Sequence, residues 1–418
     1  MDLNKKIENL VKSAKEASRI LAKTSTLAKN KALILMAKGL RVGSSAIIKA
    51  NKRDLLKAKS LGLSGALIDR LKLDNKRIEG MAKSIEEVAK LSDPCGVIEK
   101  MWNRPNGLII GKMKVAMGLI GIIYESRPNV TADCASLCLK SGNAVILKGG
   151  KESINSNMAI YNILRQALKK SGLPESSICM IDSTDRKAVS RLLEMDKYVD
   201  LIIPRGGESL IRAVANKSRI PVIKHYKGVC HTYIDSKADQ KKALDICINA
   251  KVQRPGVCNA METLLVDKKI AGEFLPTVIE KLKEEGVEIR GCDITRRIVD
   301  GLTRAKESDW YEEYLDLILS VKVVNGVDGA ISHITKYGSS HSDSIVTEDF
   351  KIALRFLKEV DSSCVYSNVS TRFTDGFEFG FGAEIGISTD KLHARGPMAL
   401  EELTTYKYII LGDGQTRK

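Results

Sequence analysis

One cysteine of this sequence stands where a thiol is presented rather than packed. Pro255 and Gly256 break regular structure just before Cys258, in the segment from Val252 to Ala260. A thiolate on such a turn can attack a carbonyl carbon and form a covalent acyl intermediate. Free cysteines are more often core residues, so the local pattern alone leaves a core position for Cys258 open.

Two short glycine turns have the composition of a nucleotide site. One holds Lys148, Gly149 and Lys151, and the other holds Gly206 and Gly207. Each turn follows a predicted strand and precedes a predicted helix, an arrangement that exposes backbone N–H groups to an anion. Neither turn has the GxGxxG spacing, so a turn selected only for its backbone geometry remains the alternative.

A polar cluster from Glu125 to Asn129 follows a buried-type strand at residues 119–124. Ligands of open α/β sheets bind at the carboxyl ends of strands, which is where this cluster is expected. The side-chain amide of Asn129 can donate a hydrogen bond to a developing oxyanion. Its other interpretation is a cap for the helix that follows.

The elements that position these residues are predicted from hydrophobic periodicity. The first third is helical, and from Gly118 onward strands and helices alternate, which is typical of a parallel sheet covered on both faces. The runs 108–115 and 404–411 stand apart from the alternation, and we expect them to pair with each other. The predicted helices are 3–21, 32–50, 77–91, 130–140, 152–170 and 243–250, and the predicted strands are 119–124, 144–147, 178–181, 199–203, 262–266, 287–289 and 317–324.

Composition narrows the class of protein. The chain has 418 residues and a formal charge of +16, but its Lys and Arg residues are dispersed and aromatics make up only 5%. We therefore expect a solvated basic surface and no nucleic-acid partner. Nine cysteines without framework spacing indicate reduced thiols, and Cys134 and Cys138 favour a core position over a metal site. We expect no metal site. Residues 1–16 are predicted to form an amphipathic helix rather than a signal peptide, and no stretch is long and apolar enough for a membrane span, so we expect a cytoplasmic protein.

Four longer motifs resemble the aldehyde dehydrogenase superfamily. They lie at residues 121–130, 203–208, 252–262 and 379–388, so the resemblance spans nearly the whole chain. It implies an α/β fold with two Rossmann-like lobes built on parallel sheets, plus a small β oligomerisation ribbon. The expected NADP-binding domain covers 1–103 and 118–231, the catalytic domain with Cys258 covers 232–398, and the ribbon covers 104–117 and 399–418.

The resemblance also implies residue roles. Cys258 is expected to be the nucleophile, and Asn129 with the Cys258 backbone N–H is expected to form the oxyanion hole. Lys148 is expected to contact the adenosine ribose, beside Gly149, Gly206 and Gly207, and Glu313 to hold the nicotinamide ribose. By their location in the motifs, Arg127 and Arg254 are candidates for binding the substrate, and Arg127, Arg205 and Arg254 are candidates for binding the leaving phosphate.

Two departures from the superfamily pattern bear on the reaction. Hydrolytic members carry a general-base Glu where this chain reads Lys224-His225-Tyr226-Lys227-Gly228, so an acyl enzyme here is expected to exchange with phosphate rather than with water. Members that prefer NAD often carry a Glu near the position of Lys151. A lysine there suits a 2′-phosphate, so NADP(H) is the expected cofactor.

The resemblance implies NADPH-dependent reduction of L-glutamyl 5-phosphate to L-glutamate 5-semialdehyde with release of phosphate, the second step of proline biosynthesis from glutamate. A separate glutamate 5-kinase is expected to make the acyl phosphate, with direct hand-over between the two enzymes left open, and the chain is expected to form a homo-oligomer. The alternatives are a non-phosphorylating semialdehyde dehydrogenase and a basic RNA-binding protein with an inactive dehydrogenase fold.

Overall fold

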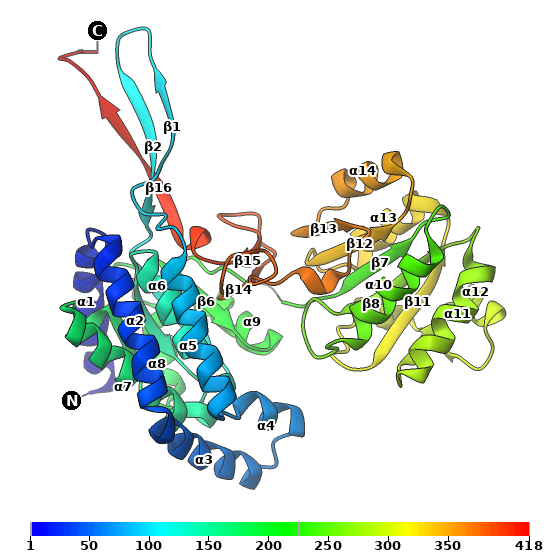
Figure 1. The fold of residues 1–418 in the computed structure, drawn as a ribbon, viewed down its shortest axis with the longest axis horizontal. Helices are drawn as coiled ribbons and strands as arrows, with labels where there is room; N and C mark the ends of the chain where they lie inside the picture. The colour runs from blue at the N-terminus through cyan, green and yellow to red at the C-terminus, as the bar shows by residue number, and fades with distance from the viewer. Residues whose placement is uncertain (1, 225, 418) are drawn as a thin grey trace. The chain divides into compact units, whose positions relative to one another are not determined.

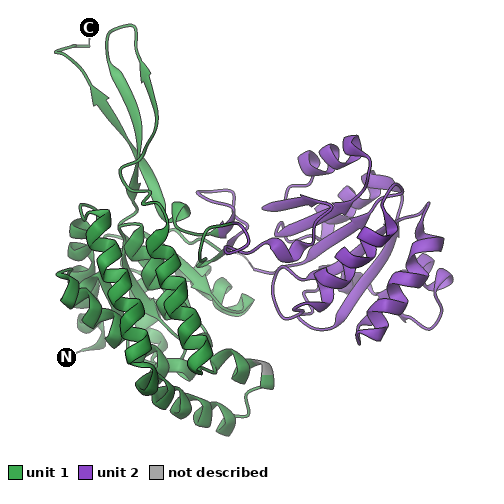
Figure 2. Cartoon of the chain, in the orientation of Figure 1, with its two compact units in different colours: residues 1–224, 380–386, 398–418 green, residues 225–379, 387–397 purple. Residues whose placement is uncertain are grey.

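The computed structural model describes residues 2–224 and 226–417. The chain divides into two compact units (Figure 2): unit 1 holds residues 1–224, 380–386 and 398–418, and unit 2 holds residues 225–379 and 387–397. Each unit contains its own parallel sheet, and each is described by itself below.

Unit 1 begins with helices α1 (Leu3–Leu21), α2 (Thr26–Val42), α3 (Ser44–Ser60), α4 (Gly65–Leu71) and α5 (Asn75–Lys90) (Figure 1). The single helix predicted over 32–50 is wrong. Gly43 separates α2 from α3 with a ψ of 6°, outside the helical range. Glycine has a low helix propensity, and the apolar spacing continues across it, which is why periodicity alone missed the break.

The sheet of unit 1 has the order β5-β4-β3-β6, and its strands are parallel. Strand β3 therefore has β4 on one side and β6 on the other, which makes the carboxyl end of β3 a topological switch point. The strands are β3 (Leu119–Tyr124), β4 (Ala144–Lys148), β5 (Ile178–Met180) and β6 (Leu201–Arg205), and the helices are α6 (Val130–Lys140), α7 (Ile154–Ser171), α8 (Arg186–Leu193) and α9 (Glu208–Lys217).

The sheet of unit 2 has seven strands in the order β10-β9-β11-β8-β7-β12-β13, again parallel. Its strands are β7 (Cys230–Ile234), β8 (Met261–Asp267), β9 (Glu288–Gly291), β10 (Thr303–Arg304), β11 (Ile318–Val324), β12 (Ser342–Val346) and β13 (Cys364–Ser367). Helices α10 (Gln240–Val252), α11 (Ala271–Glu284), α12 (Asp293–Ile298), α13 (Gly326–Tyr337) and α14 (Phe350–Glu359) connect them. Two apolar clusters pack between these helices and the strands.

The predicted pairing of the two isolated strands is confirmed. Strand β16 (Thr404–Leu411) runs antiparallel to β2 (Ile109–Ala116), with Thr404 opposite Ala116 and Leu411 opposite Ile109. A further strand, β1 (Ile98–Asn103), pairs with the other edge of β2 and completes a three-stranded ribbon. This strand lies outside the predicted ribbon range of 104–117, because its mixed polar sequence shows no alternation.

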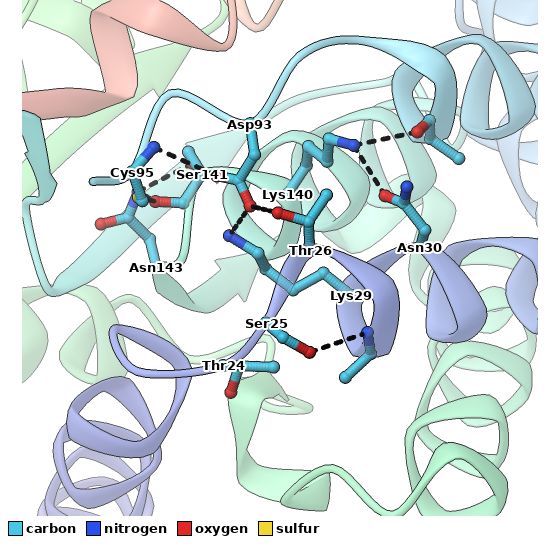
Figure 3. A network of polar contacts seen from close by, with 12 residues as sticks. Thr24, Ser25, Thr26, Lys29, Asn30, Asp93, Cys95, Lys140, Ser141 and Asn143 are labelled. Carbon is cyan, nitrogen blue, oxygen red and sulfur yellow. Dashed lines mark hydrogen bonds and ion pairs between the residues drawn. The ribbon is translucent and has the colours of Figure 1, made fainter. Parts of the chain in front are cut away.

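A buried polar network holds the segment that leads into the ribbon (Figure 3). The Lys29 ammonium, 1% exposed, lies 2.5 Å from the Asp93 carboxylate, which also accepts a hydrogen bond from Thr26. The Lys140 ammonium donates to Asn30 and to the carbonyl of Ala89. Helices α2, α5 and α6 are therefore joined by ionic and polar contacts at the ribbon's base.

The same network reaches the strand that returns to the ribbon. The Asn143 amide donates to the carbonyl of Leu403, one residue before β16, and to the Ser141 hydroxyl. The Cys95 thiol lies 3.0 Å from the carbonyl oxygen of Ser141. Both entry points of the ribbon are thus fixed to the C-terminal end of α6.

The compact units differ in extent from the predicted domains. A boundary between residues 231 and 232 cuts through β7, whereas the units divide at 224/225 because β7 pairs with β8 and β12 of the second sheet. Residues 380–386 and 398 also group with unit 1 rather than with the catalytic range 232–398. No described helix is long and apolar enough to cross a membrane.

Candidate active site

Cys258 lies on the loop between α10 and β8 of unit 2, where the chain turns through Pro255 and Gly256. The residue is partly exposed, unlike the fully buried Cys134 and Cys138 of α6. No residue of the described chain accepts a hydrogen bond from the Cys258 backbone N–H. Both the thiol and one backbone donor are therefore positioned to act on a ligand.

The neighbouring residue fixes the loop. Asn259 is 5% exposed, and its amide nitrogen donates to the carbonyl of Thr374 at 2.8 Å. Its side-chain oxygen accepts from Arg372, and its backbone carbonyl accepts from the Thr371 hydroxyl at 2.7 Å. The side chain and the backbone carbonyl of Asn259 thus bond the Cys258 loop to residues 371–374.

A close backbone approach fixes the Cys258 carbonyl. A Cβ atom at Gly228 would overlap the Cys258 carbonyl oxygen, so only glycine fits there. The buried Cys230 thiol lies 3.2 Å from the same oxygen. The Gly228 N–H donates to Glu313 Oε1 at 2.9 Å, which connects the predicted nicotinamide-ribose residue to the backbone that packs on Cys258.

The segment predicted to lack a general base does contact acids. Lys227 lies 3.8 Å from Glu312, and Gly228 is bonded to Glu313, so carboxylates from another part of the chain reach it. His225 of the same segment lies outside the described residues. Residues 224–228 contain no carboxylate in sequence, but Glu312 and Glu313 lie next to them in the structure.

An ion pair is buried at the two ends of the Cys258 loop. Lys251, the last but one residue of α10, lies 2.6 Å from Glu262 of β8, and neither side chain has exposed surface. Burial raises the pKa of Glu262 to about 7 and lowers the pKa of Lys251. Glu262 also accepts from the backbone N–H of Leu315. The pair joins helix and strand where the loop leaves them.

In unit 1, Asn129 lies between β3 and α6 at the switch point of the sheet. It has helical backbone angles and makes no capping hydrogen bond, so it does not act as a helix cap. Its amide nitrogen instead donates to the Asp133 carboxylate at 3.0 Å. That bond orients the amide and leaves its second N–H for an incoming oxyanion.

The first glycine turn lies at the end of β4. Lys148 is 8% exposed, donates to the carbonyl of Gly149 at 2.7 Å, and has its pKa lowered by burial. A Cβ at Gly149 would overlap the amide of Asn157 on α7, so the turn is held close to that helix. Lys151 is exposed, at the start of the 3₁₀ helix η1 (Lys151–Ser153).

The second glycine turn connects β6 to α9. The Gly207 N–H donates to the Glu125 carboxylate at 3.0 Å, so an acid from the end of β3 already contacts this helix N-terminus. The next carboxylate after Lys151, Glu152, accepts from the backbone N–H and hydroxyl of Ser126. The carboxyl ends of β4 and β6 in one sheet thus carry Lys148, Gly149, Lys151, Gly206 and Gly207, at the edge where nucleotide-binding sheets hold their ligands. Glu313, the remaining predicted cofactor residue, belongs to unit 2.

The two residues predicted to bind the substrate lie in different units. Arg127 is partly buried in unit 1, and Arg254 is exposed on the Cys258 loop of unit 2. Sequence reasoning missed Arg372, which lies 113 positions from Asn259 but is bonded to it. No spacing rule connects residues so far apart. The described residues contain no group of three or more His, Cys, Asp and Glu side chains that could hold a metal ion.

Comparison with known proteins identifies the class. The model of the aldehyde dehydrogenase family matches residues 3–290. The chain therefore belongs to the aldehyde dehydrogenase family, in agreement with its two parallel sheets and antiparallel ribbon.

Similar proteins narrow the family. The chain is 59% identical over 412 residues to a gamma-glutamyl phosphate reductase of Caldanaerobacter subterraneus subsp. tengcongensis, covering 99% of this chain and 100% of that protein. It is 56% identical to the protein of that name from Thermodesulfovibrio yellowstonii, over the full length of both. A crystal structure of gamma-glutamyl phosphate reductase from Thermotoga maritima matches with a TM-score of 0.96 at 49% identity, covering 99% of this chain and 100% of that one. Within the aldehyde dehydrogenases, the chain thus belongs to the gamma-glutamyl phosphate reductases.

Proposed function

We propose that this oxidoreductase reduces L-glutamyl 5-phosphate to L-glutamate 5-semialdehyde with NADPH and releases phosphate. The relatives named gamma-glutamyl phosphate reductase support the substrate, since two of them match at 56–59% identity over essentially the whole chain. The single structural observation that carries the proposal is the partly exposed Cys258 on a loop fixed through Asn259. In this proposal the reaction is the second step of proline biosynthesis from glutamate.

The first chemical step uses this chain's own residues. The Cys258 thiolate attacks the acyl carbon, a C–S bond forms, and the C–O bond to the phosphoryl group breaks, so phosphate departs with that electron pair. The Cys258 backbone N–H and the Asn129 amide stabilise the oxyanion of the tetrahedral intermediate. A thioester on Cys258 remains.

The second step reduces that thioester. Bound NADPH supplies the hydride. Collapse of the resulting thiohemiacetal on Cys258 releases the semialdehyde and restores the thiolate, and Asn129 again holds the developing oxyanion. Covalent capture by Cys258 divides one difficult reduction into two easier steps.

The preference for NADPH rests on the turn after β4. Lys151 is exposed there, where an ammonium can pair with a 2′-phosphate. Lys148, Gly149, Gly206 and Gly207 are the remaining cofactor residues of this proposal, with Glu313 at the nicotinamide ribose. Glu152, the carboxylate next to Lys151, accepts hydrogen bonds from the backbone N–H and the hydroxyl of Ser126.

The reverse reaction tests the proposal. Purified protein receives glutamate 5-semialdehyde and NADP⁺, with and without inorganic phosphate, and NADPH formation is followed by absorbance. We expect activity that depends on phosphate and is absent in Cys258→Ala. Turnover of Cys258→Ala at the wild-type rate would refute the mechanism.

A second candidate function is a non-phosphorylating semialdehyde dehydrogenase. The contact of Glu313 with Gly228 favours it, because a carboxylate close to the Cys258 backbone could activate a deacylating water. This enzyme would form NADPH at the same rate without phosphate. The phosphate series of the reverse assay therefore separates the two functions.

The proposal also includes the surroundings of the enzyme. A separate glutamate 5-kinase supplies the labile acyl phosphate, and hand-over between the two enzymes shortens its lifetime in water. All nine cysteines are free thiols, which fits the reducing cytoplasm. The ribbon makes a homo-oligomer the proposed assembly state.

A further inference from the structure

Arg372 lies across the loop that carries Cys258. It belongs to the 3₁₀ helix η4 (Thr371–Phe373) of unit 2 and is partly buried. Its Nε donates to the side-chain oxygen of Gln253 at 2.9 Å, and its Nη1 donates to Asn259 Oδ1. Gln253 and Asn259 flank Cys258 on the two sides, so the guanidinium bridges both ends of the nucleophile's loop.

A second cation lies near the first. Burial lowers the pKa of Arg372, and the positive charge of Arg254 lowers it further, while Asp375 and Cys258 act in the opposite direction. Arg254 is exposed and stands four residues before Cys258. Arg254 directly follows Gln253, to which Arg372 is bonded, and an anion bound between two like charges relieves their repulsion.

The bonds of Arg372 leave part of its guanidinium for a ligand. Within the described chain they use Nε and Nη1, so the Nη2 side is not engaged by protein. A guanidinium presents its N–H groups in a planar fork that matches the oxygens of a phosphate. Arg372 is therefore already oriented by the loop it fixes, and a ligand loses little freedom in binding to it.

We propose that Arg372, with Arg254, forms the anion site that receives the phosphoryl group of the acyl phosphate while Cys258 attacks the acyl carbon. This inference rests on the proposed function. The phosphoryl oxygen is bonded to the attacked carbon, so the phosphorus must lie close to Sγ, whereas the substrate's α-carboxylate lies at the other end of the carbon chain. Arg372 is bonded to Asn259, the residue after Cys258, so its charge lies close enough to Sγ to bind the phosphoryl group.

The chemical role of the site follows from the charge that develops. As the C–S bond forms and the C–O electron pair leaves with the phosphate, negative charge grows on the phosphoryl oxygens. Two guanidinium groups stabilise that charge and assist departure. In the reverse direction the same groups bind inorganic phosphate beside the thioester.

The first test measures the KM values of the reverse reaction. Arg372→Met is expected to raise the KM for phosphate about 10- to 100-fold, the loss associated with one charge-assisted hydrogen bond, and to leave the KM for semialdehyde nearly unchanged. Arg254→Met, which leaves the bonds to Gln253 and Asn259 intact, should raise it less. Arg355→Met is the control, because it removes an equal charge from the exposed face of α14.

The outcomes separate the inference from the function it rests on. A wild-type enzyme without phosphate-dependent activity refutes the proposed function. A phosphate-dependent wild type in which Arg372→Met changes only the KM for semialdehyde refutes the inference, and assigns Arg372 to the α-carboxylate.

A second test needs no turnover. Cys258 of the whole enzyme is alkylated with iodoacetate, an anion, or iodoacetamide, which is neutral, and the modified peptide is measured by mass spectrometry. The ratio of the two rates reports the positive charge beside the thiol. A change in how well the loop is ordered would alter both rates alike and leave the ratio unchanged. We expect Arg372→Met to lower the ratio about 10-fold, and phosphate to slow iodoacetate more in wild type than in the variant. An unchanged ratio would overturn the inference even if both rates shifted together.

Discussion

At the scale of single residues, burial separates Cys258 from most of the other cysteines. Cys95 and Cys292 are partly exposed as well, but the Cys95 thiol donates to the carbonyl of Ser141, and the Cys292 sulfur lies 3.3 Å from the Thr295 hydroxyl. Burial raises the pKa of the thiols of Cys134, Cys138, Cys230 and Cys247, and it raises the pKa of Cys179 to about 12. These thiols stay protonated at neutral pH and are poor nucleophiles. Cys258 is instead partly exposed on its loop, and the backbone around it is fixed by hydrogen bonds.

Removal of the Asn129 amide should slow the reaction without abolishing it. One oxyanion donor is worth about 10²–10³ in rate, and the Cys258 backbone N–H remains in Asn129→Ala. We expect kcat to fall by that factor while circular dichroism stays that of the wild type. A variant with unchanged kcat would exclude Asn129 from the oxyanion hole.

Asp133, which accepts the hydrogen bond from the Asn129 amide, makes the free energy of unfolding depend on pH. Burial raises its pKa from an ordinary value of 3.8 to about 6, although its bond from Asn129 acts in the opposite direction. The folded state then holds the proton more tightly than the unfolded state. The unfolding free energy therefore decreases as pH rises from about 4 to about 6, and the cost of the buried charge is complete above that range.

Asp133→Asn should avoid this cost and still offer Asn129 an acceptor. A pKa raised from 3.8 to about 6 corresponds to at most about 3 kcal/mol, and relaxation of the protein and water around the buried charge reduces this to about 1–2 kcal/mol. We expect the variant to be more stable by that amount in urea titrations at pH 8. The difference should shrink toward pH 4, and a gain that is constant with pH would contradict this explanation.

At the scale of elements, charges buried between helices fix where the ribbon leaves the helices of unit 1. Lys29 of α2 pairs with Asp93, which precedes β1, and Lys140 of α6 bonds to α2 and to the end of α5. An unpaired charge in such a position is costly, because the protein replaces only part of its lost hydration. The network therefore depends on every partner being present.

Lys29→Met should destabilise unit 1 strongly. The substitution leaves the Asp93 carboxylate without its cation, a loss of about 3–5 kcal/mol for a buried pair. Lys6→Met is the matched control, since the Lys6–Asp182 pair is about half exposed and contributes at most about 1 kcal/mol. Urea denaturation followed by circular dichroism compares the two, and equal effects would contradict the ranking.

At the scale of the whole molecule, the ribbon exposes apolar and aromatic side chains on a sheet of only three strands. Tyr406, Tyr408 and Ile410 of β16 are each at least half exposed, and Met101 of β1 is 46% exposed. Apolar and aromatic side chains exposed together on one surface are typical of a protein–protein contact. We propose that a second copy of the chain covers this face in the homo-oligomer.

Charges placed on this strand should dissociate the assembly. We expect the double variant Tyr408→Glu/Ile410→Glu to shift the mass measured by light scattering to that of one chain, since burying two carboxylates at an interface is strongly unfavourable. The control Lys407→Glu changes the charge of the same strand without adding a carboxylate at either apolar position. A double variant with the wild-type mass would exclude this face of the ribbon from the interface.

The sequence by itself determined those elements and loops that depend on neighbouring residues. The alternation of apolar runs predicted the strands 119–124 and 404–411 at their observed bounds, because burial and backbone hydrogen bonding leave a periodic mark on neighbouring residues. Pro255 and Gly256, with the motifs around them, indicated that Cys258 lies on a loop.

Only the tertiary structure decided which distant residues meet. Strand β1 follows no alternation and is held by its partner β2, and residues 380–386 join unit 1 although both flanking segments belong to unit 2. The bonds from Arg372 to Asn259 and from Gly228 to Glu313 join residues that no periodicity relates. Such contacts depend on how packed elements close on each other, and that information is spread over the whole chain rather than written in any one segment.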